Sequence, residues 1–191
     1  ITVPGFWLGK TTAGGSIWDS VELPGFSSHT SVGLPEVPAV TEMFALPFGS
    51  EAVVTIQDVN FTSYSGINLV PAQTAEIDMP HNPYPFRQDA VAYDANSFFP
   101  GNWAEVNNPA IWGGINTDRL LFNPFRYNPA TGELQAARTI RVRIDFEGSA
   151  NALAYSSNEF VQNAASSTLI NYSVVDAAAS ATVDADAAAY V

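Results

Sequence analysis

The chain has 191 residues, of which 47% are apolar and 14% charged. Nineteen acidic against seven basic side chains give a formal charge of -12, which repels phosphate groups, so we expect no nucleic-acid partner and no attraction to anionic lipids. The chain contains no Cys, which excludes disulfides, zinc-thiolate sites and a thiol nucleophile within it. The apolar content suffices for the core of one ordinary domain, and no apolar run approaches the roughly 20 residues that span a bilayer.

Four aromatic residues stand among Gly-rich turns in the N-terminal third: Phe6, Trp7, Trp18 and Phe26. This pattern predicts short strands whose aromatic side chains pack in the core of a β-structure. A face that binds sugar rings is the alternative interpretation of the same residues.

Strand signals dominate the middle of the chain. Residues 51–61 are rich in β-branched side chains, and residues 139–146 alternate between polar or charged and apolar side chains. The alternation predicts one buried and one solvated face, which favours an antiparallel sheet. The side chains expected on the buried face are Ile140, Val142, Ile144 and Phe146.

A turn signal separates two of the predicted strands. The run from Asn128 to Gly132 contains Pro129, which presets φ, and Gly132, which tolerates a positive φ. Because the turn lies between the apolar runs that end at Phe122 and begin near Ile140, the pattern predicts a β-hairpin.

The C-terminal region changes character, because Pro is absent after Pro129 and the last Gly is Gly148. Residues 156–159 have the spacing of a capping box, and apolar positions follow at helical intervals. The expected helix face is Val161, Ala165, Thr168, Leu169 and Tyr172. We therefore predict an all-β, antiparallel β-sandwich over residues 1–174 with one short C-terminal helix, and a low-complexity Ala/Asp tail or linker over residues 175–191.

Candidate catalytic residues do not form a coherent site. His29 and His81 lie in different predicted loops, with no acid at triad or metal-ligand spacing and no nucleophile-elbow glycines. The pair Asp184 and Asp186 lacks the further oxygen ligands and the turn Gly of a calcium loop. The sequence predicts a non-catalytic chain without cofactor or metal.

Several motifs occur in the order and spacing typical of one family. The motifs are Gly33-Leu-Pro35-Glu-Val-Pro38, the strand 52–60, Pro71-Ala72, Phe98-Phe-Pro-Gly101, Phe122-x-Pro124-x-x-Tyr127-Asn-Pro129, Arg141-Val-Arg-Ile144 and Asn171-Tyr172. Together they resemble the propeptide domain of gingipain-type, caspase-like (clan CD) cysteine peptidases, over about residues 33–172. The resemblance implies an antiparallel β-sandwich that assists the folding of such a peptidase and masks its active-site cleft until it is cleaved away.

The resemblance also suggests an inhibitory loop. In the arginine-specific members, a basic residue of the loop that follows the position of Pro71 enters the specificity pocket. The matching residue here is Asp78, and Glu76 and Arg87 are further candidates in the same loop. An acidic residue in that role implies a partner with a cationic pocket, because a carboxylate loses its hydration on entry. The alternative is that Asp78 is an ordinary solvated carboxylate.

The same preference would explain the release site. No Lys or Arg follows Arg143, whereas Asp176, Asp184 and Asp186 lie in the small-residue tail. Cleavage after one of these Asp residues is therefore the predicted release from the peptidase.

Two other functions fit the composition. The chain could be a structural subunit of an extracellular assembly, self-assembling through a tail that adds a strand to a neighbour's sheet. It could also be a carbohydrate-binding module, an interpretation that depends on the aromatic residues. The chain begins at Ile1 without a leader, so we expect a processed or excised segment of a secreted or cell-surface protein.

Overall fold

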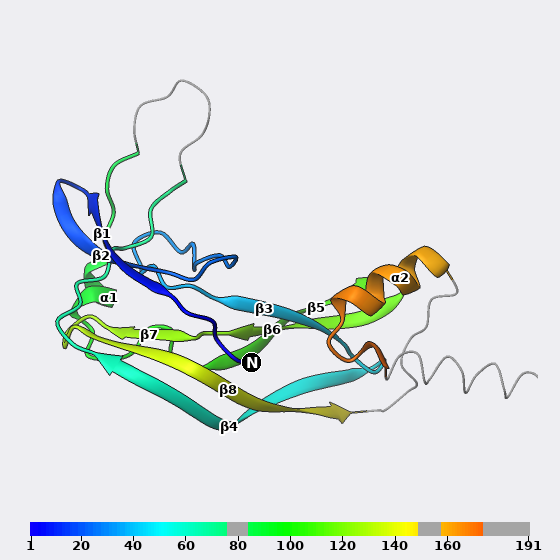
Figure 1. Ribbon diagram of the computed structural model, residues 1–191. Coiled ribbons are helices and arrows are strands. Elements are labelled where there is room, and N and C mark those ends of the chain that lie inside the picture. Colours follow the sequence, from blue (N-terminus) through cyan, green and yellow to red (C-terminus); the bar gives the residue numbers. More distant parts are fainter. Residues whose placement is uncertain (76–83, 149–157, 174–191) are drawn as a thin grey trace, which may run out of the picture. The chain divides into compact units, whose positions relative to one another are not determined.

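The computed structural model describes residues 1–75, 84–148 and 158–173. The elements follow in the order β1 (Trp7–Ala13), β2 (Ser16–Glu22), β3 (Val40–Ala45), β4 (Ser50–Tyr64), α1 (Ala90–Asp94), β5 (Ala104–Trp112), β6 (Ile115–Phe122), β7 (Phe125–Asn128), β8 (Glu133–Gly148) and α2 (Glu159–Thr168) (Figure 1).

The strands form three sheets, ordered β1-β2, β3-β6-β5 and β4-β8-β7. Strands with antiparallel pairing dominate the described residues and the helices are short, which confirms the predicted all-β sandwich class. The helix α1 was not predicted; it spans five residues and begins at the N-cap Asp89, whose side chain accepts a hydrogen bond from Ala92 N–H.

The chain divides into two compact units. Unit 1 contains Ile1–Val40, Ile56–Trp103 and Phe122–Arg141, and unit 2 contains Thr41–Thr55, Ala104–Leu121 and the described residues from Val142 on. The predicted tail, residues 175–191, lies outside the described residues, so the predicted boundary at residue 174 stays a prediction.

The predicted hairpin in unit 1 is confirmed. β7 and β8 pair antiparallel, with Asn128 opposite Glu133, and Gly132 of the connecting turn has φ +64°. Side chains from this hairpin fill the core, since Phe125, Tyr127 and Leu134 are at most 1% exposed. The turn chemistry and the apolar spacing therefore act together, as the sequence indicated.

Only part of the predicted apolar face of β8 is buried. Ile140 is buried at 1% exposure, whereas Val142 and Ile144 are half-buried and Phe146 is 42% exposed. The prediction of a fully buried face is thus wrong at Phe146, which lies near the end of the strand, where the ring of Phe44 covers one side of it at 6.1 Å.

The N-terminal aromatics also divide into two groups. Trp18 is buried at 8% exposure, and Phe6 packs edge-to-face on Phe125 at 4.9 Å, as predicted. The prediction of core packing is wrong for Trp7 and Phe26, which are 68% and 44% exposed. Trp7 begins β1, a strand of a two-stranded sheet that is exposed along most of its length, so its ring is not covered.

The C-terminal helix packs within unit 2 as its spacing predicts, except at Thr168, which is exposed and so does not belong to the buried face. Ala165 and Leu169 are buried against Ala45 and Ile115, with Val161 beside them. The N-cap is Asn158, whose side chain accepts hydrogen bonds from two N–H groups of the first turn, so the helix begins two residues later than the predicted capping box. Residues 156 and 157 lie outside the described residues.

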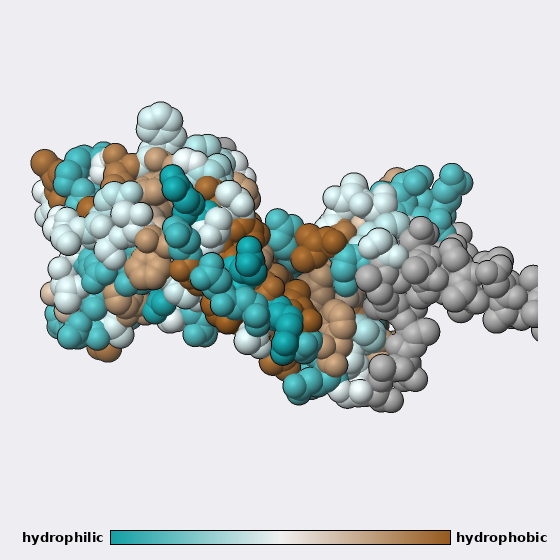
Figure 2. All heavy atoms as spheres, turned by 60° about the horizontal axis from the view of Figure 1, so that its bottom comes forward, coloured by the Kyte–Doolittle hydropathy of each residue, from teal (hydrophilic) through white to brown (hydrophobic). Residues whose placement is uncertain are grey.

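Apolar side chains are also found on the surface. Val53, Ile56 and Phe61 of β4 are about two-fifths exposed. Brown hydrophobic residues lie between teal hydrophilic ones across the face seen in Figure 2. This mixture agrees with a sequence that is low in charge, because apolar atoms must cover the area that charged groups do not.

Candidate functional site: the base of a loop in unit 1

The candidate site consists of the two chain segments that lead into and out of residues 76–83. We call residues 67–75 the ascending stem and residues 84–89 the descending stem. Arg87 lies in the descending stem, whereas Glu76 and Asp78, like the release candidates Asp176, Asp184 and Asp186, lie outside the described residues. The structure therefore shows how the two stems are held.

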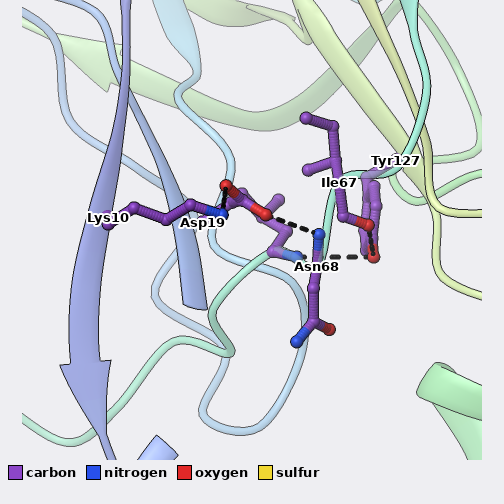
Figure 3. A network of polar contacts seen from close by, with 6 residues as sticks. Lys10, Asp19, Ile67, Asn68 and Tyr127 are labelled. Atoms are coloured by element: carbon purple, nitrogen blue, oxygen red, sulfur yellow. Dashed lines mark hydrogen bonds and ion pairs between the residues drawn. The ribbon is translucent and has the colours of Figure 1, made fainter. Parts of the chain in front are cut away.

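The ascending stem is fastened to β2 through Asp19. Its carboxylate accepts a hydrogen bond from Asn68 N–H at 2.8 Å and forms an ion pair with Lys10 at 2.5 Å (Figure 3). The backbone of Asp19 pairs with the stem as well, because its N–H donates to Asn68 O and its carbonyl accepts from Val70 N–H. Burial raises the pKa of Asp19, but the Asn68 N–H and the Lys10 ammonium outweigh it, and the net pKa is lowered. Asp19 is consequently an ionised anchor.

Two tyrosine hydroxyls hold the same stem from the other side. Tyr127 donates to Ile67 O at 2.9 Å and accepts from Leu69 N–H at 3.4 Å (Figure 3), and Tyr93 donates to Leu69 O at 2.8 Å. Burial raises the pKa of both hydroxyls, so both remain protonated donors. Leu69 is fully buried, and its backbone groups have partners within the protein.

Gly33 joins the two stems through its backbone. Its N–H donates to Ala72 O at 2.8 Å in the ascending stem, and its carbonyl accepts from Asp89 N–H at 3.0 Å in the descending stem. Gly33 has φ +90°, and a Cβ added to it would lie 3.1 Å from Asp89 N. The first glycine of the predicted Gly-x-Pro-x-x-Pro motif is therefore required by backbone geometry at this junction.

Gln73 joins the stems a second time, through its side-chain amide. Its Nε2 donates to Arg87 O at 2.7 Å and to Pro71 O at 2.9 Å, and its Oε1 accepts from Arg87 N–H at 2.9 Å. The amide thus pairs with both backbone groups of one residue, as a neighbouring strand would. Residues 73 and 87 are fixed side by side although 14 positions separate them.

An aromatic contact fixes the descending stem. The ring of Phe86 lies 5.8 Å from the ring of Trp18, which itself lies edge-on to Tyr93 at 6.3 Å. Trp18 Nε1 donates to Ala13 O, and a Cβ at Gly14 would come within 2.5 Å of Phe86 Cγ. The turn between β1 and β2 therefore leaves space for Phe86 only because residue 14 is a glycine.

A cavity of about 370 Å³ opens beside the ascending stem. Polar and charged side chains line it, among them Lys10, Glu22, Glu36 and Gln73. Burial, and then the nearby Glu22, raise the pKa of Glu36. The described residues contain no group of three or more His, Cys, Asp or Glu side chains placed to hold a metal ion.

Other motif residues have structural partners in unit 1. The guanidinium of Arg126 lies over the rings of Phe98 and Trp103 at 5.1 and 4.9 Å, and its Nε donates to Pro100 O. His29 is within hydrogen-bond distance of Asn123 Oδ1 at 2.9 Å. These contacts explain the Phe98–Gly101 motif as packing around β7.

The residues that hold the stems were mostly missed from the sequence. Asp19, Gln73, Tyr93 and Tyr127 belong to no motif of catalytic or binding chemistry, although Tyr127 was part of the hairpin pattern. Arg87 was selected for its side chain, whereas the contacts described above use its backbone.

Comparison with known proteins gives a consistent assignment. A family model described as Propeptide_C25 matches residues 9–179. Lys-gingipain HG66 of Porphyromonas gingivalis is 29% identical over 148 residues, which are 74% of this chain and 8% of that protein. Gingipain R1 of the same species is 25% identical over 115 residues, 59% of this chain and 11% of that protein. The chain thus spans about a tenth of the length of the curated relatives it matches.

Two solved structures share the fold. The structure titled "Complex of Porphyromonas gingivalis RgpB pro- and mature domains" has a TM-score of 0.78 at 19% identity, with 91% of this chain and 90% of that chain covered. A structure described as giving insight into the zymogenic latency of gingipain K has a TM-score of 0.66 at 27% identity, covering 78% and 85%. The family match over most of the chain shows that the protein belongs to the Propeptide_C25 family, the gingipain-type propeptide domains.

Proposed function

We propose that this chain is the non-catalytic prodomain of a secreted gingipain-like cysteine peptidase, which it helps to fold and keeps inactive. Family membership and the likeness to a pro-domain solved with its mature domain support a peptidase partner. The observation that carries the inhibitory role is the double fastening of the stems, by Gly33 and by Gln73. Two stems that are fixed to each other have less conformational freedom to lose on binding, which favours tighter binding.

The proposed contact residue is Asp78. In this proposal its carboxylate occupies a cationic specificity pocket as an uncut or slowly cut substrate mimic, and release occurs after Asp176, Asp184 or Asp186. The sequence supports this pairing, because residues 144–191 contain these three Asp residues and no Lys or Arg. Glu76 and Arg87 are the other candidates for the pocket.

Inhibition constants against the cognate caspase-like peptidase domain test the proposal. We expect Asp78→Ala to weaken inhibition by about 2–4 kcal/mol, since it leaves a buried cationic pocket without its anion. Glu76→Ala and Arg87→Ala should have smaller effects. Asp58→Ala removes an exposed carboxylate from β4 and serves as the matched control.

Two results would contradict the assignment. If Asp78→Ala inhibits as strongly as the wild type, Asp78 is not the contact residue. If the partner cleaves peptides only after Arg or Lys, both the acidic contact and the acidic release site fail.

The chaperone-like role is tested separately. The unfolded peptidase domain should regain activity in higher yield when it is refolded with this chain present and the chain is then removed. An equal yield with and without the chain would exclude assistance of folding.

A further inference from the structure

We infer that Gln73 is a positioning residue that sets the spacing of the two stems from which the chain inhibits its peptidase, an inference that rests on the proposed inhibitory function. Gln73 does not lie at the segment that is proposed to enter the cleft. Its side chain acts instead on Arg87, at the far end of the loop, by fixing the distance between the stems.

Gln73 uses both its amide oxygen and its amide nitrogen in hydrogen bonds to the backbone, although its side chain is only half-buried. The amide oxygen accepts from Arg87 N–H, and the amide nitrogen donates to Arg87 O and to the carbonyls of Pro71 and Ala72, at 2.7 to 3.2 Å. Both donor hydrogens and the acceptor are thereby used. A primary amide carries its donor and its acceptor on two separate atoms of one plane, so it can pair with the N–H and the C=O of the same residue.

The position of the Gln73–Arg87 contact explains how it aligns the two stems. The Gly33 bridge connects Ala72 with Asp89, and the Gln73 contact lies one residue further along the ascending stem and two residues nearer the loop on the descending stem. Successive rungs at the base align the two stems, as neighbouring pairs do in a strand ladder. With Gln73 removed, the Gly33 rung remains, so the domain should fold while the two stems lose their alignment at residues 73 and 87.

The first measurement is amide hydrogen exchange of Arg87, resolved by NMR in the isolated chain. We expect the Arg87 N–H to be protected in the wild type and to lose at least tenfold in protection in Gln73→Ala. Gln73→Glu retains an acceptor for this N–H but loses the donor to Arg87 O, so it should keep part of the protection. Gln88→Ala, an exposed glutamine in the same stem, is the matched control and should leave Arg87 unchanged.

The second measurement is inhibition of the cognate peptidase domain by the same variants. Gln73→Ala should weaken inhibition about tenfold, while its thermal midpoint stays within about 3 °C of the wild type, because the core is untouched. Gln73→Glu should lie between Gln73→Ala and the wild type, and Gln88→Ala should inhibit as the wild type does.

The outcomes separate this inference from the proposed function. Unchanged Arg87 exchange in Gln73→Ala, or unchanged inhibition by that variant, overturns the role of Gln73. A wild-type chain that fails to inhibit overturns the proposed function and with it the inhibitory role of Gln73, while the exchange data still show whether Gln73 aligns the stems.

Discussion

Replacing Tyr127 by Phe would test how strongly the ascending stem is anchored. The substitution keeps the ring, which is 1% exposed, and removes only the hydroxyl. It therefore deletes the hydrogen bond to Ile67 O at 2.9 Å and the longer one from Leu69 N–H at 3.4 Å, without opening a cavity. Leu69 is fully buried, so its N–H cannot turn to water for a new partner.

The expected cost follows from these two bonds. Removal of the hydroxyl leaves Ile67 O without this donor, and an unpaired polar group inside a protein costs about 1–3 kcal/mol. The 3.4 Å contact to Leu69 N–H is too long to add much. We therefore expect a loss of about 2 kcal/mol in the free energy of unfolding. With a urea m-value of about 2 kcal/mol/M, the midpoint should fall by about 1 M while m stays constant.

The assay is equilibrium urea unfolding, followed by tryptophan fluorescence, with Trp18 as a buried reporter in the same unit. Ser63→Ala is the control, because it removes an exposed hydroxyl that donates to Glu133 at 2.8 Å and should change stability by less than about 0.5 kcal/mol. The reasoning is refuted if Tyr127→Phe unfolds at the midpoint of the wild type or of Ser63→Ala.

Two further predictions concern charge and backbone geometry. The folded-state pKa of Glu36 is raised, so ionisation of Glu36 destabilises the fold as the pH rises from the ordinary value of 4.5 through the folded-state pKa. Glu36→Gln should therefore be more stable than the wild type at neutral pH, and this difference should vanish below pH 4.5. Thermal unfolding of both proteins against pH measures the difference. Equal stability of the two proteins at all pH values would contradict the shift. Gly113 has φ +59°, and a Cβ added to it would lie 2.5 Å from Val161 Cγ1. In urea unfolding, Gly113→Ala should therefore lower the free energy of unfolding by about 2 kcal/mol. Adding Val161→Ala should recover part of this loss, because it removes the close contact. A Gly113→Ala variant as stable as the wild type would exclude this close approach.

Local signals account for the parts of the fold that the sequence predicted. The β7–β8 hairpin follows from turn residues within five positions of each other, and the buried face of α2 follows from helical spacing. Each signal depends on residues that are close in the chain, where the backbone geometry fixes which side chains share a face.

The base of the loop could not be predicted in this way. Gln73 meets Arg87 across 14 positions, and Gly33 meets Asp89 across more than 50, so both contacts exist only after the sheets have formed. Glutamine also has no spacing rule that distinguishes a backbone-pairing amide from a solvated one. The exposure of Trp7 was missed for a related reason, since the sequence does not show which strand lacks a covering layer.

The two stems are joined by the backbone of Gly33 and by the Gln73 side chain bound to the backbone of Arg87, and this has a consequence for engineering. Gly33, Gln73 and the backbone of Arg87 all lie outside residues 76–83, and none of their hydrogen bonds depends on which side chains that segment carries. The segment proposed to carry specificity and the described contacts that support its stems are therefore chemically independent. The proposed function then predicts that segments of equal length from other propeptides, or selected from a library, retarget the domain to peptidases of different preference when they are grafted between the same two stems.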